Sequence, residues 1–183
     1  MRTIVRSASL IAFSVACGYA KLLLFPYLFF VEMFTVAVFL SGVLVGPAWG
    51  LWVGGVARLT FSVANPYGPP HPWILLAQTI GGAAAGGIGG FVRPWLLLAP
   101  ESSSALRRRT LVCVACGAST TLLYDALTNG AQGIVYGSFP AAIALGLLPA
   151  VQHLASNLAI FGVVGHFALP WLRRHPVAAR HAV

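Results

Sequence analysis

The stretch WILLAQTIGGAAAGGIGGFVRPWLL, residues 73–97, contains a single charged residue, Arg93, near its end. A helix needs about 20 mostly apolar residues to cross a bilayer, and this stretch meets that requirement. The whole chain has the same character, because 58% of its 183 residues are hydrophobic and 8% are charged. An average soluble domain has roughly 25% charged residues. The composition therefore predicts an all-α integral membrane protein.

Similar apolar runs recur along the chain, and we expect one membrane domain over residues 1–183 with six transmembrane helices. The predicted spans lie near 4–22, 32–46, 49–64, 73–97, 110–128 and 149–171. Apolar and polar residues do not alternate with period two, which argues against a membrane barrel. A phosphate loop ending in Gly-Lys-Ser/Thr does not occur in the sequence. Active transport would therefore draw its energy from another chain or from an ion gradient.

Arginine residues are placed asymmetrically, and with six spans they fall on one side of the membrane. They precede the first span, flank the connection between the fourth and fifth, and follow the sixth: Arg2, Arg6, Arg93, Arg107, Arg108, Arg109, Arg173, Arg174 and Arg180. By the positive-inside rule, both termini are expected in the cytoplasm of a multi-pass cell-membrane protein. Lys21 is the exception, at the outer end of the first span, where its stem could reach the interface. The net charge of +8 suits contact with anionic lipid, and no nucleic-acid partner is expected.

Three charged residues lie in or at the edge of apolar runs: Glu32, Arg58 and Asp125. A charge at membrane depth costs roughly 2.5–3.5 kcal/mol on insertion scales, so such residues are functional candidates. Arg58 has two interpretations, an ion pair with a substrate carboxylate or phosphate, or an ion pair with Asp125. His153 and Asn157 are one helical turn apart in the outer half of the sixth span and share a face. Two roles stay open for this pair: contact with a ligand, or hydrogen-bonded packing between helices.

In this topology the segments 23–31, 65–72 and 129–148 face outward and carry aromatic and amide side chains. Interfacial anchoring is the alternative role for the aromatic ones. Together with the charged residues, these segments describe an outward-facing cup lined by convergent polar groups. The predicted substrate-binding residues are Tyr27, Glu32, Arg58, Asn65, Tyr67, His71, Asp125, Asn129, Gln132, His153 and Asn157. For His71, ligation of a corrinoid metal centre and simple placement in a loop both stay open.

Small residues form two further patterns. Ala8, Ala12, Ala16 and Ala20 recur every four residues and make one smooth helix face, which permits close helix packing in lipid. This face predicts either a docking strip for a partner or a contact within the chain. The run from Gly81 to Gly90 has the same physics, and there we expect packing within the chain.

The three cysteines, Cys17, Cys113 and Cys116, all fall within predicted spans. An odd number gives no disulfide framework. Cys113 and Cys116 could hold a metal only with further ligands nearby, so we interpret all three as apolar packing residues. We expect neither a metal site nor a cofactor.

Several runs resemble the substrate-specific S components of energy-coupling-factor transporters, which are a type of ABC transporter. EMFT (32–35), FLSGVLVGPAWG (39–50) and WVGG (52–55) are similar to that family's second and third spans. LYDALTN (123–129) and GLLPAVQHLASN (146–157) look like its fifth and sixth spans. Each motif alone has low specificity. The order and spacing of the motifs carry the resemblance, which covers nearly the whole chain.

The resemblance implies a six-helix, non-enzymatic subunit that captures a vitamin or related micronutrient. Such subunits work with a transmembrane coupling subunit and two ATPase subunits, and they meet the coupling subunit through an Ala-x-x-x-Ala face on the first helix. Metal-ion members carry a His near the initiating Met, where this chain has Arg2 and Thr3, so nickel and cobalt ions are disfavoured. Riboflavin, thiamine, biotin, pantothenate and cobalamin stay open.

Two other classes of function compete with this interpretation. One is a small intramembrane enzyme in which Asp125 and His153, together with Glu32, do acid–base work. The other is a membrane scaffold subunit that binds no ligand. Saturable binding to the purified chain separates a binding subunit from a scaffold, and product formation would identify an enzyme.

Overall fold

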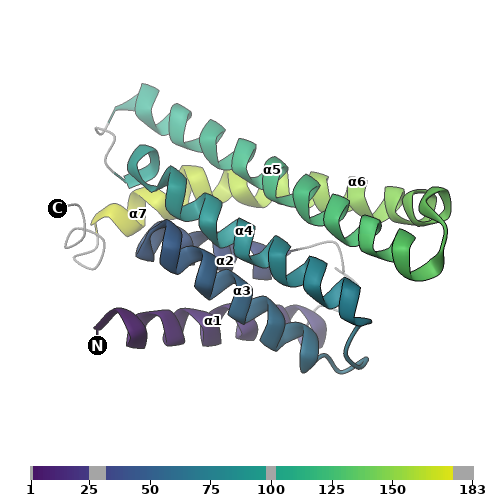
Figure 1. Ribbon diagram of the computed structural model, residues 1–183. Coiled ribbons are helices and arrows are strands. Elements are labelled where there is room, and N and C mark those ends of the chain that lie inside the picture. Colours follow the sequence, from purple (N-terminus) through teal and green to yellow (C-terminus); the bar gives the residue numbers. More distant parts are fainter. Residues whose placement is uncertain (1, 25–31, 98–101, 175–183) are drawn as a thin grey trace.

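The computed structural model describes residues 2–24, 32–97 and 102–174, and within these segments it contains helices and no strand (Figure 1). The elements are α1 (Arg2–Leu24), α2 (Met33–Val45), α3 (Pro47–Val63), α4 (Pro72–Leu97), α5 (Ser103–Tyr136), α6 (Phe139–Val163), the π-helix η1 (Val164–Ala168) and α7 (Leu169–Arg174). Because α6, η1 and α7 follow one another without a break, the described segments form six helical rods. The predicted all-α class and the predicted number of helices are confirmed.

Four helices are long and apolar enough to cross a membrane, judged by length and composition. These stretches are Thr3–Leu23, Pro72–Leu97, Ser103–Tyr136 and Phe139–Leu172. The other two helices are shorter, with 13 residues in α2 and 17 in α3. They meet at a sharp corner where Gly46 has a φ of 89° and Pro47 begins α3. A proline suits this first helical position because the missing N–H would have no helical partner there.

The predicted outward connection at 129–148 is wrong. α5 has 34 residues and continues to Tyr136, and α6 begins at Phe139, so only two residues join the helices. Gly137 adopts the left-handed conformation with a φ of 69°, which ends α5, and the Ser138 hydroxyl caps α6 by accepting from the amide of Ala141. Pro149, which suggested the start of a span, lies inside α6.

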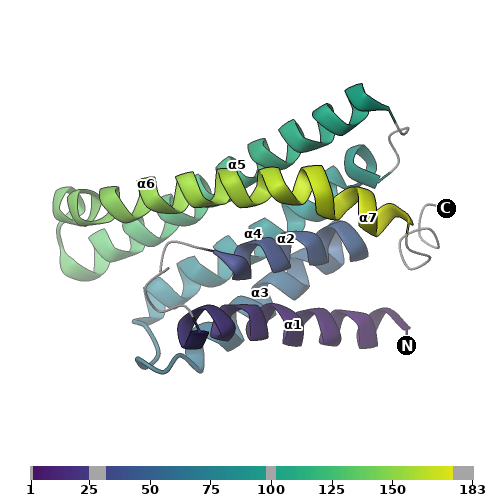
Figure 2. The same ribbon diagram turned by 180° about the vertical axis from the view of Figure 1, so that it is seen from behind.

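The helices lie roughly along one long axis with two distinct ends (Figures 1 and 2). We call the end where α1 begins and α7 ends the terminal end. The other is the hairpin end, where α5 turns into α6. Both views show the α5–α6 hairpin extending past the connection between α3 and α4.

α4 packs against α2, α3 and α5, and α1 packs against α2 and α3. The glycine run of α4 makes the contact with α3 possible. A Cβ atom on Gly54 would collide with the carbonyl oxygen of Gly82, and one on Gly50 would collide with that of Gly86. Backbone-to-backbone approach of this kind excludes any side chain at the contact. The expected packing of this run within the chain is confirmed.

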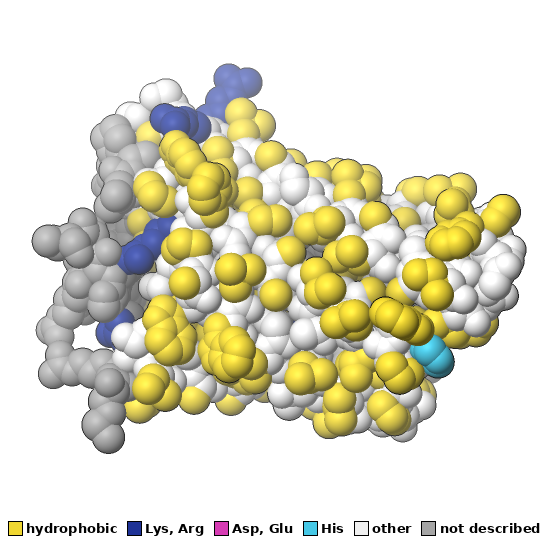
Figure 3. All heavy atoms as spheres, in the orientation of Figure 1, with side chains coloured by type: hydrophobic (Ala, Val, Ile, Leu, Met, Phe, Trp, Pro, Cys, Tyr) yellow, Lys and Arg dark blue, Asp and Glu magenta, His cyan; other side chains and the backbone are white. Residues whose placement is uncertain are grey.

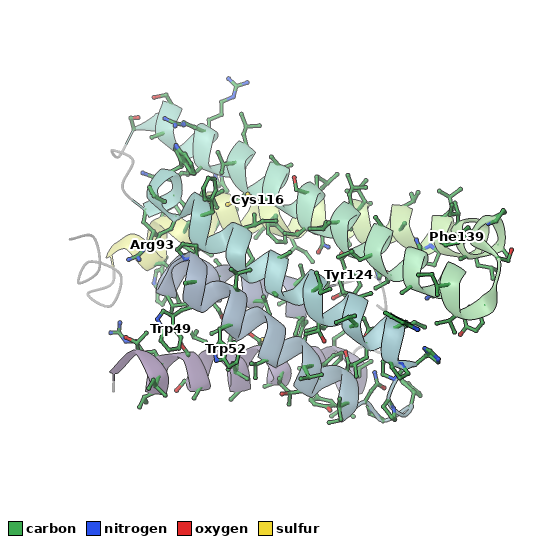
Figure 4. The ribbon with its side chains drawn as sticks, viewed as in Figure 1. Trp49, Trp52, Arg93, Cys116, Tyr124 and Phe139 are labelled. Carbon is green, nitrogen blue, oxygen red and sulfur yellow. The ribbon has the colours of Figure 1, made fainter. Side chains whose placement is uncertain are left out.

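A buried apolar cluster joins α2, α4, α5, α6, η1 and α7. It consists of Val36, Phe39, Val43, Leu96, Cys113, Cys116, Phe161, Val164 and Leu169. Two of the cysteines are thus small packing residues of this cluster, as the sequence indicated. In Figure 4, Cys116 lies nearer to the terminal end than Tyr124 does. The surroundings of Tyr124 are different in character and hold polar groups.

Candidate functional site

Three cavities share Tyr124 and His153 in their walls. The deep cavity, of about 20 Å³, lies among α2, α3, α4, α5 and α6. The α1-side cavity, of about 180 Å³, is lined mainly by α1 to α4. The hairpin-side cavity, of about 270 Å³, is lined by α4, α5 and α6. We call the three together the cup.

An ion pair lies at the edge of the α1-side cavity. Nζ of Lys21 lies 2.8 Å from Oε1 of Glu32, the residue that precedes α2, and both side chains are largely buried. The hydroxyl of Thr35 donates to Oε2 of the same carboxylate at 3.4 Å. Lys21 therefore turns toward the cup, and the expectation that its stem reaches an interface is wrong, because Glu32 offers an opposite charge within its reach.

His153 of α6 lies between two carboxylates. Its Nε2 atom lies 3.9 Å from Oε1 of Glu32, and its Nδ1 atom lies 3.5 Å from Oδ1 of Asp125. The imidazole thereby connects α6 with α5 and with the beginning of α2. Every described acidic residue of the chain is at this point, since Glu32 and Asp125 are the only Asp or Glu side chains within residues 2–24, 32–97 and 102–174.

Two residues on α5, one helical turn apart, face two residues on α6 that are also one helical turn apart. Asp125 faces His153, and Thr121 faces Asn157, whose amide nitrogen donates to the Thr121 hydroxyl at 2.7 Å. That hydroxyl in turn donates to the carbonyl of Gly117 at 2.7 Å. Asn157 is 2% exposed, so this contact fixes a buried amide at the floor of the cup.

Arg58 of α3 is 8% exposed and is surrounded by aromatic rings. Its guanidinium carbon lies 4.4 Å from the ring centre of Tyr124 and 4.9 Å from that of Phe34. Such cation–π contacts stabilise a desolvated guanidinium. Arg58 forms no ion pair with either described carboxylate, so the pairing of Arg58 with Asp125 is not present in this structure.

Three buried polar atoms of the cup have no hydrogen-bond partner among the described residues: Nε of Arg58, Oδ2 of Asp125 and Oδ1 of Asn157. All three residues line the deep cavity. Buried polar groups are nearly always paired in folded proteins, and an unpaired one costs about 1–3 kcal/mol. The residues of the cup therefore include one unpaired hydrogen-bond donor and two unpaired acceptors.

Eight of the predicted binding residues line the cup. Glu32, Arg58, Asp125, His153 and Asn157 line the deep cavity, Asn65 lines the α1-side cavity, and Asn129 and Gln132 line the hairpin-side cavity. Asn129 and Gln132 do so from within α5, since the predicted connection there is helical.

The other three predicted binding residues do not line the cup. Tyr67 is 85% exposed, and its amide donates to Oδ1 of Asn65. His71 is exposed next to the start of α4, where its Nδ1 atom accepts from the amide of Trp73 at 3.4 Å. This contact favours a local role for His71 in the connection. Tyr27 lies outside the described residues.

The sequence analysis missed several cup residues: Lys21, Phe34, Ser62, Gln78, Thr121 and Tyr124. Gln78 offered a signal, because it is an amide within an apolar run, and it accepts from the Ser62 hydroxyl at 2.7 Å. Phe34 and Tyr124 offered no signal in the sequence, because aromatic residues within apolar runs are typical of a packed core.

The alanine face of α1 points away from the other helices. Ala8, Ala12, Ala16 and Ala20 are exposed, while Ser7, Ser14 and Gly18 are buried against the bundle. Packing of the alanine face within the chain, one of the two interpretations, is therefore wrong for the described residues. Docking of a partner stays open.

Protein-family models, curated proteins and solved structures were compared with this chain, and none of them matches. The described residues include no group of three or more His, Cys, Asp or Glu side chains placed to hold a metal ion. The function must therefore be inferred from the cup itself.

Proposed function

We propose that this chain is the substrate-binding membrane subunit of an uptake transporter for a vitamin or related micronutrient. A transmembrane coupling subunit and two ATPase subunits, all separate chains, would supply the energy, as in energy-coupling-factor transporters. The observation that carries the proposal is the cup, in which the buried charges of Glu32, Arg58 and Asp125 converge between long apolar helices. Groups this costly to bury are retained in apolar surroundings when they have a function.

The distribution of side chains supports a membrane location. Apolar side chains are spread over the whole length of the face in Figure 3, and the Lys and Arg side chains visible there gather at the terminal end. Arg6, Arg107 and Arg108 belong to the helix ends at that side. By the positive-inside rule the terminal end is cytoplasmic, and the cup opens toward the outside of the cell.

The size and lining of the cup suit a small organic ligand. The two larger cavities together fall within the range of about 300–1,000 Å³ that is typical of ligand pockets. Their walls combine the aromatic rings of Phe34, Phe61 and Tyr124 with a few polar groups, and this combination orients heterocyclic ligands.

The exposed alanine face of α1 supports the expected partner. Ala8, Ala12, Ala16 and Ala20 present a shallow surface that faces away from the bundle, and a helix of another membrane protein can approach it closely. A coupling subunit would dock there, on the side of the molecule remote from the α5–α6 hairpin (Figure 2).

Native mass spectrometry of the detergent-purified chain, followed by titration of any co-purified compound, tests the proposal. We expect a bound vitamin-like molecule whose affinity falls at least tenfold in Arg58→Met. Arg108→Ala is the matched control, because it removes an exposed arginine far from the cup. A chain that binds no member of a vitamin panel would contradict the proposal and favour a scaffold.

A second candidate function is a small intramembrane enzyme. The observation that favours it is the 3.5 Å approach of His153 to Asp125, because such a pair can move a proton. Turnover of a bound compound by the purified chain, lost in His153→Gln, would establish this alternative. Release of the compound unchanged would support the binding subunit.

A further inference from the structure

A row of polar side chains on α5 faces the hairpin-side cavity. These side chains share one face of the helix, because the later ones follow the first by three, four and seven residues. They are Asp125, Thr128, Asn129 and Gln132. The cavity measures about 270 Å³, far more than the roughly 10–15 Å³ that one water molecule needs. A sizeable part of a ligand therefore fits against this row.

The amides in the wall of this cavity have hydrogen bonds left to make. The side chains of Asn129 and Gln132 bond to no other described residue. Each therefore offers a ligand both a C=O acceptor and an NH₂ donor. The Asn129 amide lies against Gly146 of α6, where a Cβ atom would collide with it. Gln78 of α4 accepts from the Ser62 hydroxyl, which leaves the NH₂ group of Gln78 as a donor.

The hairpin-side cavity has little charge to offer a ligand. No Lys or Arg is among the described residues that line it, and Asp125 is the only acidic one. The Asp125 carboxylate is already engaged, because its Oδ1 atom lies 3.5 Å from Nδ1 of His153 and its Oδ2 atom is buried. An anionic ligand group would find no counter-ion here, and a cationic one would find no free carboxylate. The amides therefore favour an uncharged group.

The adjoining α1-side cavity has a different lining. It contains the rings of Phe34, Phe61 and Tyr124, whereas Tyr124 is the only aromatic residue among those that line the hairpin-side cavity. Gln78, Tyr124 and His153 line both cavities, so the two spaces adjoin at these residues. A flat ring thus fits the α1-side cavity, and a polar part without aromatic character fits the hairpin-side cavity.

Hydroxyl groups match an amide-lined wall well. A hydroxyl donates one hydrogen bond and accepts others at a single atom, so it can pair with either end of an amide. Sugars and polyols carry several hydroxyls and no charge. A site that hydrogen-bonds a hydroxyl also rejects an analogue that lacks it, because the polar groups of the site are then left unpaired.

We propose that the hairpin-side cavity binds the sugar or polyol part of a ligand whose flat ring lies in the α1-side cavity. Asn129 and Gln132 hydrogen-bond the hydroxyl groups and set the specificity, and Gln78 donates where the two cavities adjoin. This inference rests on the proposed function and narrows its substrate class to conjugates of a flat heterocycle with a sugar or polyol.

The test is calorimetric titration of the purified full chain with matched pairs of compounds. The first pair is riboflavin and lumiflavin, in which a methyl group replaces the hydroxylated chain. The others are adenosine and uridine, each paired with its base methylated at the nitrogen that carries the ribose. Biotin and thiamine serve as vitamins that carry neither a sugar nor a polyol. We expect one hydroxylated compound to bind about tenfold or more tightly than its methylated partner.

Variants of the chain identify the residues that cause this preference. Asn129→Leu and Gln132→Met remove an amide and keep roughly the size of the side chain. We expect each to weaken binding of the hydroxylated compound about tenfold and to leave its methylated partner unaffected. The ratio of the two affinities within one variant does not depend on how much of that variant is folded. Gln152→Met is the matched control, because Gln152 lines none of the three cavities.

The outcomes separate the two proposals. Equal affinity within every pair would overturn the inference, and so would a preference that survives in both variants. Binding of biotin or thiamine alone would overturn the inference and leave the proposed function standing. Binding of none of these compounds would contradict the inference and the proposed function together.

Discussion

Nζ of Lys21, on the last turn of α1, lies 2.8 Å from Oε1 of Glu32, immediately before α2. The pair links the end of one helix to the beginning of the next at the mouth of the α1-side cavity. Both side chains are mostly buried, with 14% and 16% exposed. An ion pair in such surroundings depends on both partners, because a single remaining charge would be left largely desolvated.

Removal of one partner of this pair should destabilise the protein more than removal of both. Loss of one partner of a fully buried pair costs about 3–5 kcal/mol, and partial exposure reduces this to about 1–3 kcal/mol here. We expect Lys21→Met and Glu32→Gln each to lower the melting temperature in detergent. The melting temperature of the double variant should fall by clearly less than the sum of the two single decreases. Strict additivity would show that the two charges do not interact.

Two adjacent glycines of α3 should respond differently to alanine. A Cβ on Gly54 collides with the carbonyl oxygen of Gly82, whereas one on Gly55 lies 3.5 Å from the Ala83 Cβ, an ordinary contact. Gly54→Ala should therefore cost about 1–3 kcal/mol or more through overpacking. Gly55→Ala should be neutral or stabilise the helix by up to about 1 kcal/mol. Thermal unfolding of both variants in one detergent gives the comparison, and equal stability would refute the close packing of α3 on α4.

The turn between α5 and α6 should require glycine at position 137. Its φ of 69° lies in the left-handed region, which costs other L-residues about 1–2 kcal/mol. Gly137→Ala should lose that amount in chemical unfolding, and Gly137→Asn should lose less because Asn tolerates this conformation. No side chain lies within 4 Å of a Cβ built here, so the backbone alone decides the result. Alanine as stable as glycine would mean that the turn relaxes.

The orientation in the membrane can be measured by cysteine labelling in intact cells. Tyr67 is 85% exposed at the hairpin end, and Ser104 is exposed near the start of α5 at the terminal end. We expect a membrane-impermeant maleimide to label Tyr67→Cys and to leave Ser104→Cys unlabelled until the cells are opened. The wild-type chain controls for its own Cys17, Cys113 and Cys116. The reverse labelling pattern would contradict the predicted orientation and would mean that the cup faces the cytoplasm.

Blocking the alanine face should separate binding from transport. Ala12→Trp places a large ring on the exposed side of α1, which faces away from the bundle. We expect unchanged ligand affinity in the purified chain and loss of uptake by cells that contain the energising subunits. Leu111→Trp, at a 60% exposed position on α5, is the control and should retain uptake. Full uptake by Ala12→Trp would place the docking surface elsewhere.

Much of the fold follows from apolar runs that end at strong signals. α4 (Pro72–Leu97) nearly coincides with its predicted span because its apolar run begins directly after Pro72. α5 was underestimated at both ends. Its N-terminal turns carry Arg107 to Arg109, and its C-terminal turns carry Asn129 and Gln132, so hydrophobicity fades there while the helix continues. A two-residue turn at Gly137 and Ser138 leaves little room for a recognisable loop.

The candidate site was predictable where a residue contrasts with its neighbours. Glu32, Arg58 and Asp125 stand out as charges in apolar runs, and all of them line the deep cavity. Tyr124 carries no such contrast, and only the packing of α4 against both α3 and α5 brings Arg58 onto its ring. The Lys21–Glu32 pair was missed because the two residues belong to different predicted spans, and the turn of the chain between them, over 11 positions, brings them together only in the folded molecule.

The length of α5 has a mechanical consequence. Its 34 residues extend for about 51 Å at 1.5 Å per residue, well beyond a hydrocarbon core of about 30 Å. The apolar cluster of Phe39, Cys113 and Phe161 holds α5 toward the terminal end, and a second buried cluster of Ile74, Ala77 and Ala131 holds it against α4 near the hairpin. Ala131 is five residues from the end of α5 at Tyr136, so nearly the whole helix is anchored to the bundle. Any movement of the hairpin that widened the cup would therefore have to carry α4 with it.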